Sequence, residues 1–134
     1  MKKIIVVYGI SNVGKTTVIN DIYDNLIKNG AVVKTPKTQQ GKYPNDFDAE
    51  VTYNGRDVAL MSMGDLGTPV AAVIRKYQHS DVLVTAYNAN LATLKRDWLK
   101  CSDQILVVRK MSSSNASCIQ TDNNLFVQHV MTLI

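Results

Sequence analysis

Eight residues near the start of the chain combine two glycines with a lysine and a threonine, in a spacing that suits the binding of phosphate groups. They are Gly9-Ile10-Ser11-Asn12-Val13-Gly14-Lys15-Thr16. Gly9 and Gly14 let the backbone turn tightly, so that its N–H groups approach phosphate oxygens without a Cβ in the way. Lys15 can reach the terminal phosphates of a triphosphate, and the hydroxyl of Thr16 can hold a Mg²⁺ ion.

The residues on either side of this stretch predict the elements that would position it. The apolar run Ile4–Tyr8 predicts a strand buried on both faces. Apolar residues then recur at helical spacing from about Lys15 to Asn29, and Gly30 is a natural end for that helix. The expected inner stripe is Val18, Ile19, Ile22, Leu26 and Ile27. A helix that starts near Lys15 presents its unpaired N–H groups and a partial positive charge to the same anion.

With this context, residues 3–20 resemble the Walker A segment of the P-loop NTPase superfamily. The resemblance implies a three-layer α/β fold, binding of a Mg²⁺–nucleoside triphosphate, and often hydrolysis or phosphoryl transfer. It makes Lys15 a catalytic residue and Thr16 a metal ligand. The nucleotide-binding residues that it implies are Gly9, Ser11, Asn12, Val13, Gly14, Lys15, Thr16 and Thr17.

The rest of the chain predicts one α/β domain over residues 1–134, with a mostly parallel sheet and flanking helices. Residues 47–63 depart from the parallel pattern, because Asn54-Gly55 joins two strand-like runs and is a strong hairpin signal. That hairpin is expected at an edge of the sheet. A strand is expected at 31–34 or slightly longer, ending at Thr35-Pro36-Lys37, and further strands at 81–86 and 104–108. Helices are expected after Thr68, at 90–100 and after Thr121 or Asp122.

Asp65 follows the returning strand of the hairpin, as the Mg²⁺-binding carboxylate of a Walker B motif would. It is therefore the expected catalytic and metal-binding carboxylate. The alternative is that Asp65 is a helix cap or a turn residue. Arg75 and Lys76, in the helix that follows, are most simply solvated charges, although an arginine there could reach a γ-phosphate.

Arg109 follows the last clear strand, at an end where the base of a bound nucleotide often lies in P-loop proteins. Residues 109–120 are therefore candidate base contacts. The polar loop from Thr38 to Asp46 is either a wall of the site or an ordinary connection. Ligands of such folds sit outside the carboxyl ends of the strands.

The sequence favours ATP as the nucleotide, with GTP as the alternative. The guanine-reading [NT]KxD motif is absent, since Tyr87-Asn88-Ala89-Asn90 has neither the lysine nor the aspartate. The additional lysine of partition-type ATPases is missing as well. The net charge of +4 is small and scattered, which argues against a nucleic-acid partner.

Three functions are compatible with these residues. A hydrolase is favoured, and it needs one polar group to orient water, for which Asp46, Asp48 and Thr35 are the candidates. A small-molecule or nucleotide kinase is the second hypothesis, although no insertion supplies an arginine-bearing lid. The third is a nucleotide-dependent interaction module that contacts a partner through the loop 38–46 and the C-terminal helix.

Composition indicates a cytoplasmic protein. Cys101 and Cys118 share no metal-ligand spacing and are most simply reduced thiols. Met1-Lys2-Lys3 and the following apolar run imitate the start of a signal peptide, but the run is too short. No transmembrane stretch is expected. The apolar flanks of the final helix, which carries Leu125, Phe126, Val130 and Leu133, would either close the sheet or meet a second subunit in a homodimer.

Overall fold

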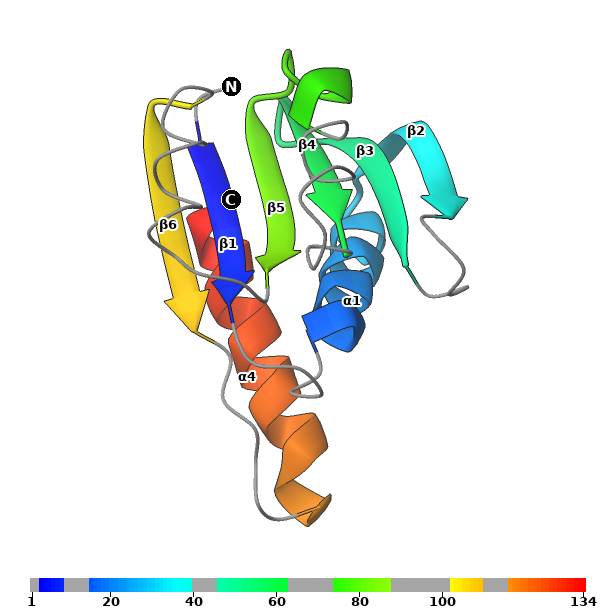
Figure 1. Ribbon diagram of the computed structural model, residues 1–134. Coiled ribbons are helices and arrows are strands. Elements are labelled where there is room, and N and C mark those ends of the chain that lie inside the picture. The colour runs from blue at the N-terminus through cyan, green and yellow to red at the C-terminus, as the bar shows by residue number, and fades with distance from the viewer. Residues whose placement is uncertain (1–2, 9–14, 40–45, 63–73, 88–101, 110–115) are drawn as a thin grey trace.

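The computed structural model describes residues 3–8, 15–39, 46–62, 74–87, 102–109 and 116–134. These residues form an α/β fold with one six-stranded sheet (Figure 1). The helices are α1 (Lys15–Lys28) and α4 (Ala116–Leu133), and residues 74–76 form a short helical segment. The strands are β1 (Lys3–Tyr8), β2 (Val32–Gln39), β3 (Phe47–Tyr53), β4 (Arg56–Met61), β5 (Val82–Tyr87) and β6 (Gln104–Arg109).

The sheet is parallel in one half and antiparallel in the other, in the order β2-β3-β4-β5-β1-β6. β1 pairs in parallel with both β5 and β6, and β4 pairs in parallel with β5. β3 is antiparallel to β4 and to β2. β1 is thus an interior strand, as its unbroken apolar run predicts, and Ile4 to Val7 are completely buried.

The hairpin of β3 and β4 is confirmed. Asn54 (φ 50°) and Gly55 (φ 74°) both occupy the left-handed region, as a two-residue type I′ turn requires. The expected edge position is wrong, because β2 lies outside β3 and β4 pairs with the parallel strand β5. β2 also extends to Gln39, past the predicted end at Thr35-Pro36-Lys37, since its second half continues to pair with β3 through two register shifts.

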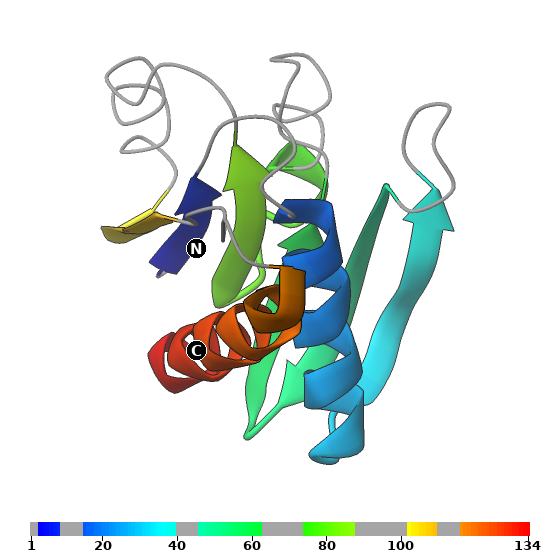
Figure 2. The same cartoon turned by 90° about the horizontal axis from the view of Figure 1, so that it is seen from below.

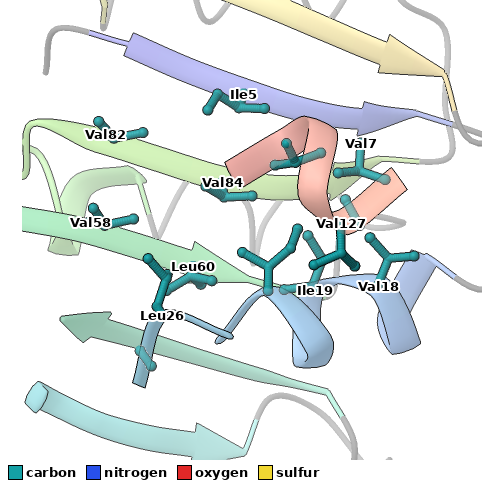
Figure 3. Packing of buried hydrophobic residues seen from close by; sticks show 14 of the residues in the cluster. Ile5, Val7, Val18, Ile19, Leu26, Val58, Leu60, Val82, Val84 and Val127 are labelled. Carbon is teal, nitrogen blue, oxygen red and sulfur yellow. The ribbon is translucent and has the colours of Figure 1, made fainter. Parts of the chain in front are cut away.

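α1 covers one face of the sheet and ends as predicted. Gly30 (φ 96°) donates its N–H to the carbonyl of Ile27, and Ala31 donates to that of Leu26, which is a Schellman cap. Val18, Ile19, Ile22 and Leu26 pack with Ile5, Val7, Leu60 and Val84 (Figure 3). Ile27, expected in this stripe, is instead 37% exposed, because it lies on the flank of the buried face.

α4 lies on the same face of the sheet as α1 (Figure 2). It starts at Ala116, earlier than the predicted cap at Thr121 or Asp122. The residues from 116 to 122 include no glycine or proline, so extending the helix over them costs little. Val127 and Val130 form its buried stripe, whereas Leu125, expected to be apolar contact surface, is 66% exposed.

The opposite face of the sheet is covered by residues 74–77. Ile74 and Tyr77 pack against Ile4, Val6 and Leu83. Both residues are buried, and they lie in the part of the chain where a helix is expected after Thr68. The described residues therefore bury apolar side chains on both faces of the sheet.

Candidate functional site

The carboxyl ends of β1, β5 and β6 meet at one edge of the sheet. Tyr8, the last residue of β1, is paired with Tyr87 of β5 and with Arg109 of β6. Arg109, a predicted base contact, therefore lies on the strand next to β1 at the edge where β1 leads toward α1. This edge is the candidate functional site, because ligands of open α/β sheets bind outside the carboxyl ends of the strands.

The stretch that the sequence predicts to bind phosphate follows β1 at this edge. Gly9, Ser11, Asn12, Val13 and Gly14 lie outside the described residues, but both flanks are described. β1 ends at Tyr8, and Lys15 and Thr16 are the first two residues of α1. Thr17, in the first turn of α1, is exposed. The predicted strand before the glycine-rich stretch and the predicted helix after it are thus confirmed.

β4 brings the chain toward the predicted metal carboxylate. Asp65 lies outside the described residues, three positions after the buried Ser62. Ser62 extends the pairing of the hairpin beyond Met61: its Oγ accepts a hydrogen bond from the Phe47 N–H (2.8 Å), and its own N–H donates to the Phe47 carbonyl (3.0 Å). Because only β5 separates β4 from β1, the chain leaves β4 about 10 Å from the end of β1.

Asp46 and Asp48 were candidates to orient water, and the structure gives them different surroundings. Asp46 accepts a hydrogen bond from the Ser62 hydroxyl (3.3 Å) and is partly exposed. The carboxylate of Asp48 is fully buried, where it accepts hydrogen bonds from the Tyr77 hydroxyl and from the Lys76 ammonium group (2.9 Å). Lys76, expected to be a solvated charge, is exposed as predicted, and its ammonium group in addition forms an ion pair with Asp48, which the sequence did not indicate.

A second carboxylate, Glu50, shares the face of the sheet with Asp48. It accepts a hydrogen bond from the Ser80 hydroxyl, and the Lys34 ammonium group lies 3.9 Å from it. Sequence reasoning missed this pair. The signal was present, because Asp48 and Glu50 alternate with the apolar residues Phe47, Ala49 and Val51 at the period of a strand. Two acids on one face of a buried strand need donors nearby.

Burial raises the pKa of Tyr77 well above its usual range, and the hydrogen bond to Asp48 raises this pKa further. An unfolded tyrosine ionises at about pH 10, while folded Tyr77 keeps its proton, so its stabilising effect is complete below about pH 10 and is lost as the pH rises. The free energy of unfolding of the wild-type protein should therefore fall as the pH rises above about 10. This fall should be steeper than that of Tyr77→Phe by about 1.4 kcal/mol per pH unit.

Urea denaturation at several alkaline pH values measures this difference. The control is Tyr53→Phe, which changes a partly exposed tyrosine at the end of the same hairpin. Parallel alkaline losses in the wild-type protein and Tyr77→Phe would contradict the assignment.

Lys37 joins β2 to α1. Its ammonium group lies 4.5 Å from the ring centre of Tyr23 and 4.6 Å from that of Phe47, and it donates to the side-chain oxygen of Asn20 (3.0 Å). The two rings themselves pack edge to face. This cation–π contact holds the outer strand of the sheet against α1.

Lys34 and Asp57 form a second link, at the amino end of the parallel strands. Their charged groups are 2.7 Å apart. The hydrogen bonds from Lys34 and Thr52 hold the pKa of Asp57 below its usual value. Because Asp57 in turn donates its N–H to the Asp81 carboxylate, this cluster connects β2, β4 and the start of β5, away from the candidate site.

No group of three His, Cys, Asp or Glu side chains gathers into a metal site among the described residues. Thr35, the third candidate to orient water, is partly exposed in β2. In the described part of the chain, neither helix combines the length and the hydropathy that crossing a membrane requires. No protein-family model matches the chain, and no curated protein or solved structure is significantly similar to it.

Proposed function

We propose that this chain binds a Mg²⁺–nucleoside triphosphate, with ATP favoured over GTP, and hydrolyses it. The observation that carries the proposal is the stretch Gly9–Thr16, in which both glycines, the lysine and the threonine stand at the required spacing between a strand and a helix. An ordinary turn before a helix needs a glycine at most, so the combination favours phosphate binding.

The described fold supports the proposal through the start of α1. The first four N–H groups of a helix have no partner within it, and they carry about half a positive charge. α1 begins at Lys15, just past the carboxyl end of the interior strand β1. A buried strand leading to a helix N-terminus at that edge suits a triphosphate tail. The residues present therefore fit the nucleotide.

In this proposal Lys15 binds the β- and γ-phosphates, and the backbone of Ser11 to Gly14 surrounds their oxygens. Thr16 and Asp65 would hold Mg²⁺, which neutralises charge on the phosphates when it is bound. A water oxygen forms a bond to the γ-phosphorus while the bond from that phosphorus to the bridging oxygen breaks. The products are a nucleoside diphosphate, orthophosphate and a proton.

Asp65→Asn is expected to weaken triphosphate binding when Mg²⁺ is present and to leave binding in EDTA unchanged, because the carboxylate acts on the metal and not on the phosphates. Titration calorimetry under the two conditions measures both affinities. Asp24→Asn, an exposed site on α1 with the same change of charge, is the control. An equal loss of affinity with and without Mg²⁺ would remove Asp65 from the metal site.

Release of phosphate separates hydrolysis from the other two functions. The wild-type protein should release orthophosphate steadily from Mg²⁺–ATP without any added acceptor, and Lys15→Ala should not. Turnover that depends on an added nucleotide or metabolite, with a phosphorylated product, would indicate a kinase instead. Tight binding without turnover would indicate an interaction module. A thermal-shift comparison of ATP and GTP identifies the preferred base, since stabilisation follows ligand concentration over Kd.

A further inference from the structure

β6 is the last strand of the described sheet, yet its residues are those of an interior strand. It lies at the end opposite β2, and among the described strands only β1 pairs with it (Figure 1). Its centre is the unbroken apolar run Ile105-Leu106-Val107-Val108, and all four residues are only partly buried. Alternate residues of this run pack against the core cluster on each face of the sheet. A strand that is apolar on both faces is typical of the interior of a sheet.

The strand at the other end, β2, carries the features by which proteins keep an edge strand from pairing with another chain. Pro36 has no N–H to donate, Lys34 and Lys37 add charge, and two register shifts interrupt the pairing with β3. β6 contains neither proline nor lysine, and it pairs with β1 without a shift. Its one charged residue is Arg109, at its end. An apolar edge without such protection favours pairing with another strand.

The sequence of β6 suits pairing with a second copy of itself. In a closed dimer, two copies of β6 that pair through this edge are antiparallel and are related by a two-fold axis normal to the sheet. Facing residues then project from the same face, so even-numbered residues face even-numbered ones and odd-numbered residues face odd-numbered ones. When Leu106 faces its own copy, Ile105 faces Val107. The apolar centres of the two strands therefore meet.

Charge complementarity selects this register. Asp103, which is exposed and directly precedes β6, then faces Arg109 of the second copy, so that opposite charges stand at both ends of the pairing. A shift of two residues in one direction would place Arg109 opposite Ile105. A shift in the other direction would place Asp103 opposite Val107. Either shift would replace a favourable pair of charges by a charge against an apolar residue.

We propose that the chain forms a homodimer in which the two copies of β6 pair antiparallel, with Leu106 at the two-fold axis, so that the two sheets become one. The dimer completes the open edge of β6 and covers its partly buried apolar run. The inference does not depend on nucleotide binding. It does bring the subunits together beside the candidate site, because Arg109 is paired with Tyr8 of β1 at that edge.

Sedimentation equilibrium of the wild-type chain at increasing concentration should give a particle of twice the mass of the chain. Asp103→Lys places like charges at both ends of the interface, so the dissociation constant of its dimer should be about tenfold higher or more. Asp103→Lys combined with Arg109→Asp exchanges the two charges and should restore the association of the wild-type chain. Circular dichroism verifies the fold of each variant.

Two further variants serve as controls. Asp24→Lys makes the same change of charge at an exposed position of α1 and should leave association unchanged. Leu125→Lys tests whether the subunits meet through α4 instead, since Leu125 is 66% exposed on that helix, and it should also leave the dimer intact.

A wild-type chain that stays monomeric at high concentration would overturn the inference. A dimer that Leu125→Lys dissociates would overturn it as well, and so would one that responds to Asp103→Lys no more than to Asp24→Lys. Failure of the charge exchange to restore association in a folded double variant would exclude the proposed register.

Discussion

Lys15→Ala is expected to weaken binding of a nucleoside triphosphate at least tenfold and to leave the fold intact. A hydrogen bond from a charged donor contributes about 1.5–3 kcal/mol, which corresponds to a loss of about one to two orders of magnitude in affinity. Lys15 is the first residue of α1. Alanine is an excellent helix former, so the helix should still begin there.

Titration calorimetry with Mg²⁺–ATP measures this loss, and circular dichroism verifies the fold. Lys28→Ala is the matched control, because Lys28 is an exposed lysine in the last turn of the same helix. It lies at the far end of α1 from the candidate site, so its loss should leave affinity unchanged. Wild-type affinity in a folded Lys15→Ala protein would exclude the phosphate-binding role of Gly9–Thr16.

Asp48→Ala is expected to lower the free energy of unfolding by about 2–3 kcal/mol. The substitution removes the acceptor of the Tyr77 hydroxyl, which is buried, and of the Lys76 ammonium group. Lys76 is half exposed and can turn to water, so the unpaired hydroxyl of Tyr77 dominates the cost. Asp48 alternates with Ala49 and Val51 of the α1-facing core, so it lies on the face of the sheet opposite α1.

Urea denaturation of Asp48→Ala and of a matched exposed substitution, Asp24→Ala, measures the difference. Asp24→Ala should stay within about 0.5 kcal/mol of wild type, as surface changes usually do. Asp48→Ala combined with Tyr77→Phe should recover part of the loss, because the unpaired donor is then removed as well. A loss in Asp48→Ala no greater than that of the control would show that the buried cluster does not stabilise the fold.

Local signals predicted much of this fold correctly. The interior strand β1 was indicated by its uninterrupted apolar run, and the β3–β4 hairpin by Asn54-Gly55. Gly30 was predicted to end α1 and does so with a left-handed cap. Each of these features depends on residues that are close together in the chain, so the sequence carries it directly.

Features that depend on distant pairing were predicted poorly. β2 was expected to be short, yet its polar second half is held by β3, and this pairing cannot be seen in residues 35–39 alone. Likewise, nothing near Lys76 indicates that its partner is Asp48 on the distant strand β3. The same limit applies to the candidate site: its phosphate-binding role is predicted from eight adjacent residues, whereas the pairing of Tyr8 with Tyr87 and with Arg109 at the same edge depends on strands that are distant in the chain.

The place of β1 within the sheet has a consequence for how the protein matures. β1 is made first, but both of its edges are completed by strands that are made much later, since Lys3 pairs with Val82 and with Gln104. Such distant pairings slow folding. During synthesis β1 therefore remains unpaired along both edges until β5 and β6 have been made. Unpaired apolar strands favour aggregation, so protection by a chaperone would be valuable at this stage. The architecture that makes β1 an interior strand also makes the nascent chain vulnerable.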